Sequence, residues 1–292
     1  MTTETGEKIP QAFVWRRLHS ITGLWLTIYL AVHLFTNSQA ALFFGDDGQG
    51  FIKAVNSIHE IPYLPFIEIA VLVFPILIHA IWGIYYVYRA KYNSFGNTGR
   101  EPYLPQYPRN RAYTWQRITS WILLVGIAAH VVHMRFIEYP ATAKIDHERF
   151  YMVKVNADEG LYTLAPRLGV KLYGPNELSS LETNQEWQAA LSKRPLKSGE
   201  LIATANNFGT VELLMLRNTF KSPLMIVLYT LLVLAACFHA FNGLWTFMIS
   251  WGITFTARAQ RLMQTLSIVF MVVFSALGLA AVWFTYWINL KG

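Results

Sequence analysis

The chain has 292 residues, of which 54% are hydrophobic and only 14% are charged, and its mean hydropathy is +0.31. This composition is typical of a membrane protein and excludes an ordinary water-soluble domain. The net charge of +7 does not indicate nucleic-acid binding, because the basic residues gather at the ends of apolar segments, where they act as topology signals.

Five apolar segments are long enough to cross a bilayer, for which about 20 residues suffice. We expect the spans at about residues 18–44, 65–88, 118–136, 222–250 and 266–288. The predicted fold class is therefore all-α, an integral membrane bundle of five transmembrane helices that forms a single domain over residues 1–292. The polar segment 138–221, between the third and fourth spans, is a long insertion.

The first span opens with Arg16 and Arg17 in the sequence WRRLHS. The arginine pair is also found in twin-arginine export signals, but the apolar run that follows is longer than the ~7–15 residues of a signal peptide. We therefore interpret it as an uncleaved anchor. It contains His33, and the acidic loop that follows ends in His59 and Glu60.

The second and third spans also contain histidines. His79 lies four residues after Pro75, which lacks a backbone N–H and predicts a kinked helix. The third span contains His130 and, three residues later, His133. Residues three apart share a helix face, so these two histidines compete for any single ligand role.

The insertion carries no motif that indicates chemistry. Its sequence predicts short strands at FYMVKV (residues 150–155) and LYTLA (161–165), and a helix at about 177–192. The fourth span follows and contains His239, whereas the fifth span has no histidine.

The distribution of basic residues predicts the orientation in the membrane. The N-terminal tail, the loop after the second span and the turn after the fourth span together hold eleven Lys and Arg residues, whereas the short loop after the first span holds only Lys53. The positive-inside rule therefore places the N-terminus in the cytoplasm, and the C-terminus and the insertion outside.

The histidines fall at two depths. Counted from the end where the chain enters each span, His33 is 16 residues beyond Arg17, His130 is 13 beyond Arg117, His79 is 14 beyond Pro65 and His239 is 18 beyond Lys221. At about 1.5 Å per residue, His33 and His130 lie in the outer half of the membrane and His79 and His239 in the inner half. Two histidines on two helices at one level can hold an iron by both axial nitrogens, which is the geometry of a two-haem electron wire.

An ionisable residue inside a membrane span usually has a function. Cys237 is the single cysteine, so no CxxC metal site or covalent haem attachment is available, and a haem would be held by side-chain nitrogen alone. One alternative is a transporter with an intramembrane metal or proton path, which usually needs Asp or Glu in the bilayer, and Glu68 is the one candidate. The other is a structural bundle whose histidines are satisfied by neighbouring helices. Four histidines in two level pairs favour haem b.

Several motifs resemble those of a known family. They are WRRLHSITG, AVHLFTN, FPILIHAIWGIY, WQRITS and FHAFNGLWTFMISWGIT followed by ARAQR. Together they cover all five spans and resemble the cytochrome b558 subunit of succinate dehydrogenase, of the single-chain, five-helix, two-haem type paired with menaquinone. The resemblance implies axial haem ligands at His33, His79, His130 and His239. It pairs His79 with His239 for the inner haem b and His33 with His130 for the outer one, and leaves His133 without a ligand role.

The resemblance also implies partners. The chain would be the membrane anchor of a flavoprotein subunit and an iron–sulfur subunit on the cytoplasmic face, and not an enzyme on its own. Electrons from succinate would pass from the iron–sulfur subunit through the inner and outer haems to a quinone. The basic cytoplasmic loops would serve as a docking surface or as topology signals alone.

The quinone and propionate contacts are predicted less directly. An acidic residue at the outer mouth of the second span serves related enzymes near the outer haem, and the nearest candidates are Glu60 and His59, with His59 at the matching position. Arg17 and Ser20, near the cytoplasmic end of the first span, are candidate partners of a haem propionate. The alternative is that all four are ordinary polar residues at helix ends.

Two departures from the family pattern matter. The insertion is much longer than in the family's short members, so its fold cannot be carried over. Fumarate reductases of this type that are driven by menaquinol carry a glutamate two residues before the fourth ligand, where this chain has Cys237. We therefore expect succinate oxidation, with a fumarate reductase anchor as the alternative.

Overall fold

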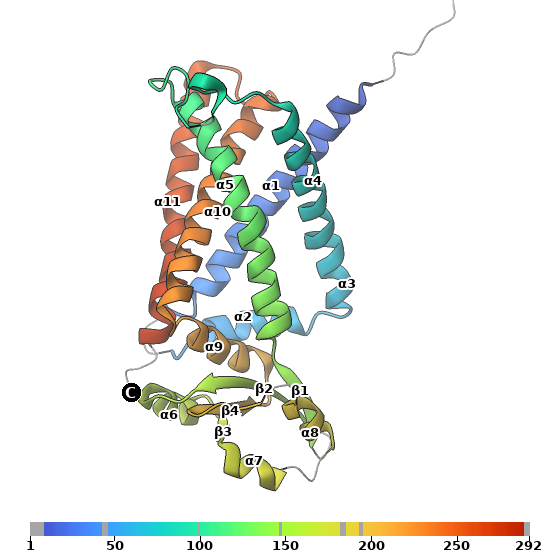
Figure 1. Ribbon diagram of the computed structural model, residues 1–292, viewed down its shortest axis with the longest axis vertical. Helices are drawn as coiled ribbons and strands as arrows, with labels where there is room; N and C mark the ends of the chain where they lie inside the picture. Colours follow the sequence, from blue (N-terminus) through green and yellow to red (C-terminus); the bar gives the residue numbers. More distant parts are fainter. Residues whose placement is uncertain are drawn as a thin grey trace, which may run out of the picture. The chain divides into compact units, whose positions relative to one another are not determined.

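The computed structural model describes residues 9–42, 46–98, 100–145, 148–181, 185–192 and 195–288. In this part of the chain, five helical segments are long and apolar enough to cross a membrane, which confirms the predicted all-α bundle (Figure 1). They are α1 (Gln11–Ser38); α3 (Leu64–Glu68) continued by η1 (Ile69–Val73) and α4 (Phe74–Arg89); α5 (Pro108–Val131) continued by η3 (Val132–Ile137); α10 (Pro223–Ser250); and α11 (Ala257–Ile288).

The helices extend beyond the apolar segments that predicted them. α5 begins at Pro108, before the predicted start at residue 118, and α11 begins at Ala257 and not at 266. Proline is favoured in the first turn of a helix, and polar first turns can lie in the headgroup region, so hydropathy marks the membrane-crossing part of a longer helix. α1 ends at Ser38, and the predicted end of the first span at residue 44 lies outside the described residues.

The chain forms two compact units, and all five spans contribute residues to both. Unit 1 comprises residues 1–31, 65–124 and 235–272, and unit 2 comprises residues 32–64, 125–234 and 273–292. Unit 1 is helical apart from its connecting loops, one of which contains the short 3₁₀-helix η2 (Phe95–Asn97). Unit 2 contains helical segments and a β-sheet.

In unit 1, the irregularity predicted at Pro75 is a π-helical turn. Pro75 has no N–H, so the carbonyl of Val71, one turn earlier, has no helical donor. The backbone widens to a π-helix over η1, and Trp25 of α1 donates its indole N–H to the Val71 carbonyl at 2.7 Å. A side chain from another span thus replaces the missing backbone donor.

The sheet of unit 2 has four antiparallel strands in the order β1-β2-β4-β3. The strands are β1 (Ala141–Ile145), β2 (Glu148–Asn156), β3 (Lys171–Tyr173) and β4 (Glu200–Ala205). The predicted strand FYMVKV lies in β2, where Met152 is fully buried against Ile202 of β4 and Trp187 of α8 (Gln185–Ser192). The predicted helix at 177–192 is divided between α7 (Pro175–Leu181) and α8, with residues 182–184 outside the described chain.

The predicted strand LYTLA was wrong, because these residues lie in α6 (Glu159–Arg167). Asp158 caps this helix by accepting a hydrogen bond from the Leu161 backbone at 2.9 Å. Leu161, Leu164 and Ala165 are buried, which is the spacing of a helix face and not of a strand.

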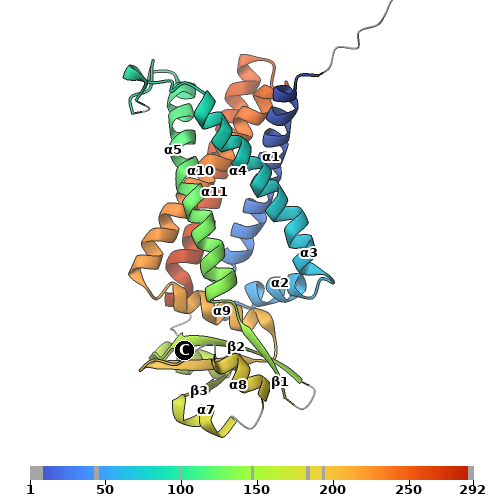
Figure 2. The ribbon, with the colours of Figure 1, turned by 45° about the vertical axis from the view of Figure 1, so that its right-hand side comes forward.

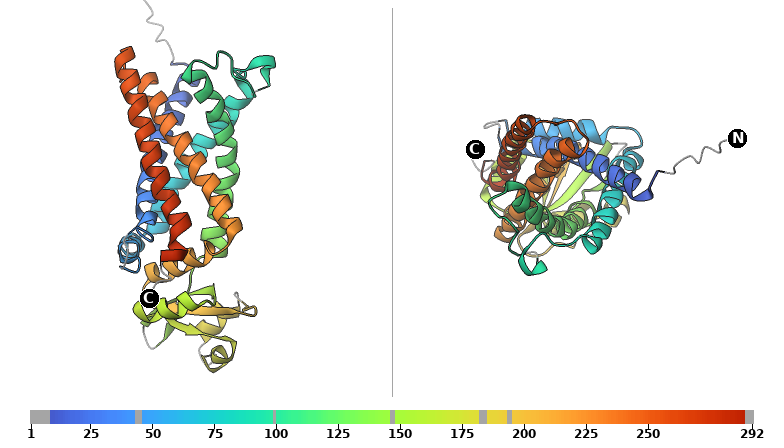
Figure 3. Two further views of the ribbon diagram at one scale, coloured as in Figure 1. Left: turned by 90° about the vertical axis from the view of Figure 1, so that its left-hand side faces the viewer. Right: turned by 90° about the horizontal axis from the view of Figure 1, so that it is seen from above.

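Helix α9 (Phe208–Thr219) packs on β2 and β4, and α2 (Gln49–His59) lies beside α9 (Figures 1 and 2). A Cβ on Gly209 would lie 2.5 Å from the Ile52 carbonyl oxygen, so only glycine allows this approach of the two backbones. Asn56 of α2 accepts a hydrogen bond from the Gly209 N–H at 2.7 Å. In the same unit, the parts of α10 and α11 that belong to it are antiparallel neighbours (Figure 3), joined by a hydrogen bond from Trp283 to Thr230 at 2.9 Å.

Candidate functional site

The four predicted ligands form two pairs, one in each unit. In unit 1, the ring centres of His79 on α4 and His239 on α10 are 6.2 Å apart, with an interplanar angle of 78°. In unit 2, the ring centres of His33 on α1 and His130 on α5 are 6.0 Å apart, with an angle of 77°. The folded chain therefore brings together the residues that the depth argument paired.

These separations fit two imidazoles on opposite sides of one metal atom. A metal–nitrogen bond of about 2 Å plus about 1 Å from the nitrogen to the ring centre, taken twice, gives about 6 Å between ring centres. Among the residues that the structure describes, no three or more His, Cys, Asp or Glu side chains gather where they could hold a metal ion. A zinc site usually needs three or four protein ligands, whereas a haem iron needs only its axial ones. The residues present therefore fit a haem.

In unit 1, the Nδ1 atoms of both histidines face oxygen acceptors. His79 donates from Nδ1 to the backbone carbonyl of His19 at 3.0 Å. His239 Nδ1 lies 3.3 Å from Oγ1 of Thr119, and this hydroxyl already donates to the Trp115 carbonyl at 2.8 Å, so it accepts from His239. A neutral histidine protonated on Nδ1 has its lone pair on Nε2, which is the atom available to a metal.

In unit 2, His130 Nδ1 lies 3.2 Å from the hydroxyl of Tyr229 on α10. The same hydroxyl lies 3.4 Å from Nδ1 of His133. His79, His239 and His130 thus each have an oxygen atom near Nδ1, as is usual for metal-binding histidines.

His19 is a neighbour of His79 that is not among the four predicted ligands. Its ring stacks on the His79 ring with centres 3.9 Å apart, and it donates from Nδ1 to the His79 carbonyl at 3.0 Å. The two histidines therefore exchange hydrogen bonds between α1 and α4. His19 therefore restricts the orientation of the His79 ring, which is a predicted ligand.

The structure places Arg17 and Ser20 at the end of α10. Arg17 donates to the carbonyl of Ser250 at 3.0 Å, and its guanidinium lies 4.6 Å from the ring centre of Trp251. Ser20 accepts from the Trp251 indole at 3.0 Å. Both residues fix the contact between α1 and α10.

The candidate quinone residues lie at the end of α2. His59 stacks on Phe208 with ring centres 3.9 Å apart, and its Nε2 is 3.3 Å from the hydroxyl of Tyr151. Glu60 follows as the C-cap of α2 and is exposed. His59 thus packs in an aromatic cluster, whereas the carboxylate of Glu60 faces solvent.

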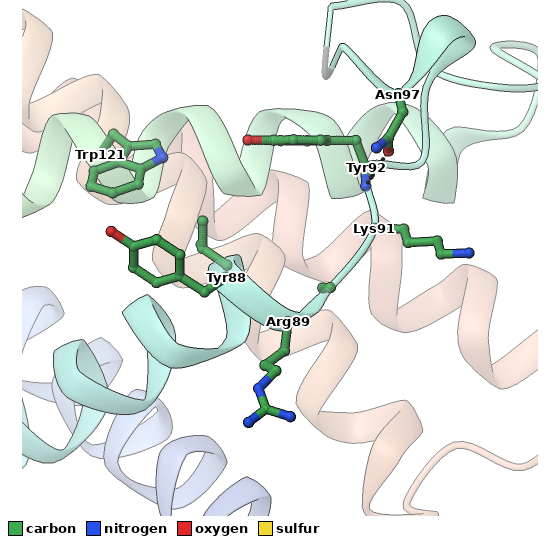
Figure 4. Close-up of a pocket in the computed structure, with 8 residues that line it drawn as sticks. Tyr88, Arg89, Lys91, Tyr92, Asn97 and Trp121 are labelled. Atoms are coloured by element: carbon green, nitrogen blue, oxygen red, sulfur yellow. Dashed lines mark hydrogen bonds between the residues drawn. The ribbon is translucent and has the colours of Figure 1, made fainter.

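A cavity of about 460 Å³ lies in unit 1 at the end of α4. It is lined by residues 87–92, Asn97 and Trp121. Figure 4 shows that Arg89 and Lys91 point away from Trp121. None of the predicted ligands lines this cavity, so it is separate from the histidine pairs.

Sequence reasoning missed Tyr229, Thr119 and Gly23 beside the ligands. Tyr229 and Thr119 reach histidines on other helices, and such contacts leave no periodic pattern in the sequence. Gly23 lies on α1, against His79 of α4. Histidines are recognisable in apolar spans, but their hydrogen-bonding partners are ordinary residues.

One curated protein is similar over nearly the whole chain. It is the succinate dehydrogenase cytochrome b558 subunit of Bacillus subtilis (strain 168), which is 26% identical over 271 residues, covering 92% of this chain and 95% of the relative. The family-level resemblance is confirmed. No family profile matches the chain, and no solved structure matches it. The likeness to cytochrome b558 therefore rests on the alignment with this relative and on the motifs of the five spans.

Proposed function

We propose that this chain is the haem b membrane anchor of a succinate dehydrogenase and passes electrons between an iron–sulfur subunit and a quinone. The observation that carries the proposal is the arrangement of four intramembrane histidines as two pairs with ring centres 6.0 and 6.2 Å apart. The alignment with a cytochrome b558 subunit supports it.

His79 and His239 would hold the inner haem b, and His33 and His130 the outer one. Haem iron alternates between its ferric and ferrous states and so carries one electron at a time. The chain's own residues provide the axial nitrogens and orient them. The His19 carbonyl and Thr119 accept from the Nδ1 atoms of His79 and His239, which would leave the Nε2 atom of each free to bind the iron.

The partners in this proposal are a flavoprotein subunit and an iron–sulfur subunit on the cytoplasmic face. Eleven Lys and Arg residues in the tail and in the loops on one side of the spans support a cytoplasmic N-terminus in a bacterial inner membrane. Succinate would be oxidised outside this chain, which would be an electron-transfer subunit of the complex and not an enzyme on its own.

For the quinone, which we take to be menaquinone, we propose a site near Glu60 and His59. Quinone reduction takes up protons together with electrons, and the exposed carboxylate of Glu60 can exchange protons with water. We expect Glu60→Gln to slow quinone reduction while both haem spectra stay unchanged. Unchanged quinone reduction in this variant would remove Glu60 from the proposal.

The haem proposal is tested by a reduced-minus-oxidised visible spectrum and a pyridine haemochrome count on the purified membrane complex. We expect two b-type haems in the wild type. His239→Ala should lose one haem and His33→Ala the other, because each removes an axial ligand of a different pair. His147→Ala, which changes a histidine outside the predicted spans, is the control and should retain both haems.

A wild-type complex without haem would overturn the proposal and favour the transporter or the structural bundle. Loss of the same haem in His239→Ala and His33→Ala would contradict the pairing alone. If haem is present, the direction of the reaction is tested by comparing succinate oxidation with fumarate reduction in the same membranes, and we expect succinate oxidation to be faster.

A further inference from the structure

Tyr229 lies between two histidines of neighbouring turns in unit 2. Its hydroxyl is 3.2 Å from Nδ1 of His130 and 3.4 Å from Nδ1 of His133. The Tyr229 ring is also held edge-on against Phe220, with ring centres 5.3 Å apart. A tyrosine on α10 therefore bridges one predicted ligand and one histidine for which the family resemblance gives no role.

The number of protons gives this bridge a direction. A tyrosine hydroxyl has a single proton, so it can donate to one of the two histidines and must accept from the other. If His130 binds a metal through Nε2, its Nδ1 carries the proton and donates to Tyr229. Tyr229 then donates to His133, whose Nδ1 accepts. The chain of donors runs from His130 through Tyr229 to His133.

We propose that Tyr229 and His133 form a positioning relay that fixes the orientation of His130 and lowers the reduction potential of the outer haem. The proposal rests on the proposed function, because it requires His130 to be an axial ligand. A hydrogen bond from the ligand's N–H to an oxygen increases the electron density of the imidazole and so favours ferric iron. Donation by Tyr229 to His133 makes the tyrosine oxygen a better acceptor, because hydrogen bonds in a chain strengthen one another.

The relay has a counterpart in unit 1, where Thr119 accepts from His239. The Thr119 hydroxyl donates its proton to a backbone carbonyl and not to a second histidine. The two pairs therefore differ in the groups behind their ligands. The outer haem should respond to His133, whereas the inner haem should respond to Thr119.

The experiment is a redox titration of both haems in the purified complex, with low-temperature electron paramagnetic resonance of the ferric signals. Tyr229→Phe retains the ring that packs on Phe220 and removes only the hydroxyl. We expect a higher midpoint potential and shifted g values for the outer haem, with the inner haem unchanged. His133→Leu should shift the outer haem in the same direction by a smaller amount. In the double variant, His133→Leu should add nothing to Tyr229→Phe, because the relay is already interrupted.

Two controls separate the relay from general disturbance. Thr119→Val should shift the inner haem alone, and Tyr162→Phe, which changes an exposed tyrosine of α6, should shift neither. An unchanged outer haem in Tyr229→Phe would overturn the proposal, and so would equal effects of His133→Leu with and without the Tyr229 hydroxyl. If Tyr229→Phe does not assemble, His133→Leu alone decides, because it leaves the ligand and the tyrosine in place. A wild-type complex without haem would instead overturn the proposed function.

Discussion

Gly23 of α1 lies directly against the ring of His79. A Cβ at Gly23 would lie 2.8 Å from Cε1 of this histidine, closer than real Cβ contacts come, and 3.2 Å from its Nδ1, which is already a tight contact. Gly23→Ala should therefore push the His79 ring away and weaken its hydrogen bond to the His19 carbonyl. We expect the variant to lose the inner haem while it retains the outer one, as measured by the haemochrome count and the difference spectrum.

Gly83 provides the matched control for this substitution. It lies on the same helix as His79, and a Cβ there would lie 3.6 Å from Cε1 of His19, which is an ordinary contact. Gly83→Ala should therefore retain both haems. Equal haem loss in the two variants would show that any added methyl group disturbs the bundle, and would contradict a specific role for Gly23.

Arg16 and Arg17 are adjacent cations with different surroundings. Arg16 is exposed, whereas Arg17 contacts Ser250 and Trp251. If Arg17 also contacts a haem propionate, as the sequence predicts for it and Ser20, Arg17→Ala should lower the midpoint potential of the inner haem, because loss of a nearby cation disfavours the reduced, less positive iron. Arg16→Ala should leave the potential unchanged. An unchanged potential in Arg17→Ala would leave this residue with a structural role only.

Asp158 should make the insertion less stable at low pH. Burial alone would raise its pKa, but hydrogen bonds and the positive charge of Arg217, with further bonds from Leu161 and Lys221, hold the pKa at about 2, below the usual 3.8. A lowered pKa contributes stability that is present above the unfolded value and is lost as the pH falls from about 4 toward about 2. Asp158→Asn retains the helix cap but leaves Arg217, which is 2% exposed, without a counter-ion.

We expect Asp158→Asn to destabilise the complex by about 1–3 kcal/mol at pH 7. Thermal unfolding of wild type and variant should be compared between pH 7 and pH 3. The difference should narrow toward pH 3 as the wild type loses its own contribution. If the difference in stability between wild type and Asp158→Asn stays constant over this pH range, the lowered pKa of Asp158 is contradicted.

Glu212 of α9 should have the opposite pH dependence. Burial raises the pKa of its carboxyl to about 7 from 4.5, although Arg135 opposes the shift. A raised carboxyl pKa means that the folded state resists ionisation, so stability is lost as the pH rises from about 4.5 to about 7. Glu212→Gln should therefore stabilise the complex by about 1–3 kcal/mol at pH 8 and by much less at pH 5. The measurement is the midpoint of thermal unfolding at both pH values. Glu159→Gln, at an exposed position of α6, should show no such gain, and an equal gain in both variants would refute the role of burial.

The parts of the structure that sequence reasoning predicted well are those with a strong local signal. Apolar length predicted the five spans, and Pro75 indicated the irregular turn in the second span. The short apolar run FYMVKV predicted β2. The error at residues 161–165 arose because a short apolar run fits a strand and a helix equally well, and the N-cap at Asp158 was the signal that distinguishes them.

The histidine pairs could be predicted by depth, but their surroundings could not. Depth places His130 at the level of His33, yet it does not show which residue of α10 meets Nδ1 of His130. The contact depends on how helices distant in sequence are rotated about their axes, as for Tyr229, which is 99 positions from His130. The same holds for the stacking of His19 on His79.

The π-helical turn at Ile69–Val73 sets the direction in which the rest of its helix faces. An α-helix turns by about 100° per residue, so the one additional residue of a π turn rotates everything that follows by about that angle. His79 faces His239 only with this rotation included. An α turn in place of this π turn, with the same residues, would point His79 about 100° away from its partner. Deletion of one residue from the π turn would instead restore a regular α-helix and leave the direction of His79 unchanged. In this second span, the conformation of one turn is therefore as important to the site as the residue types.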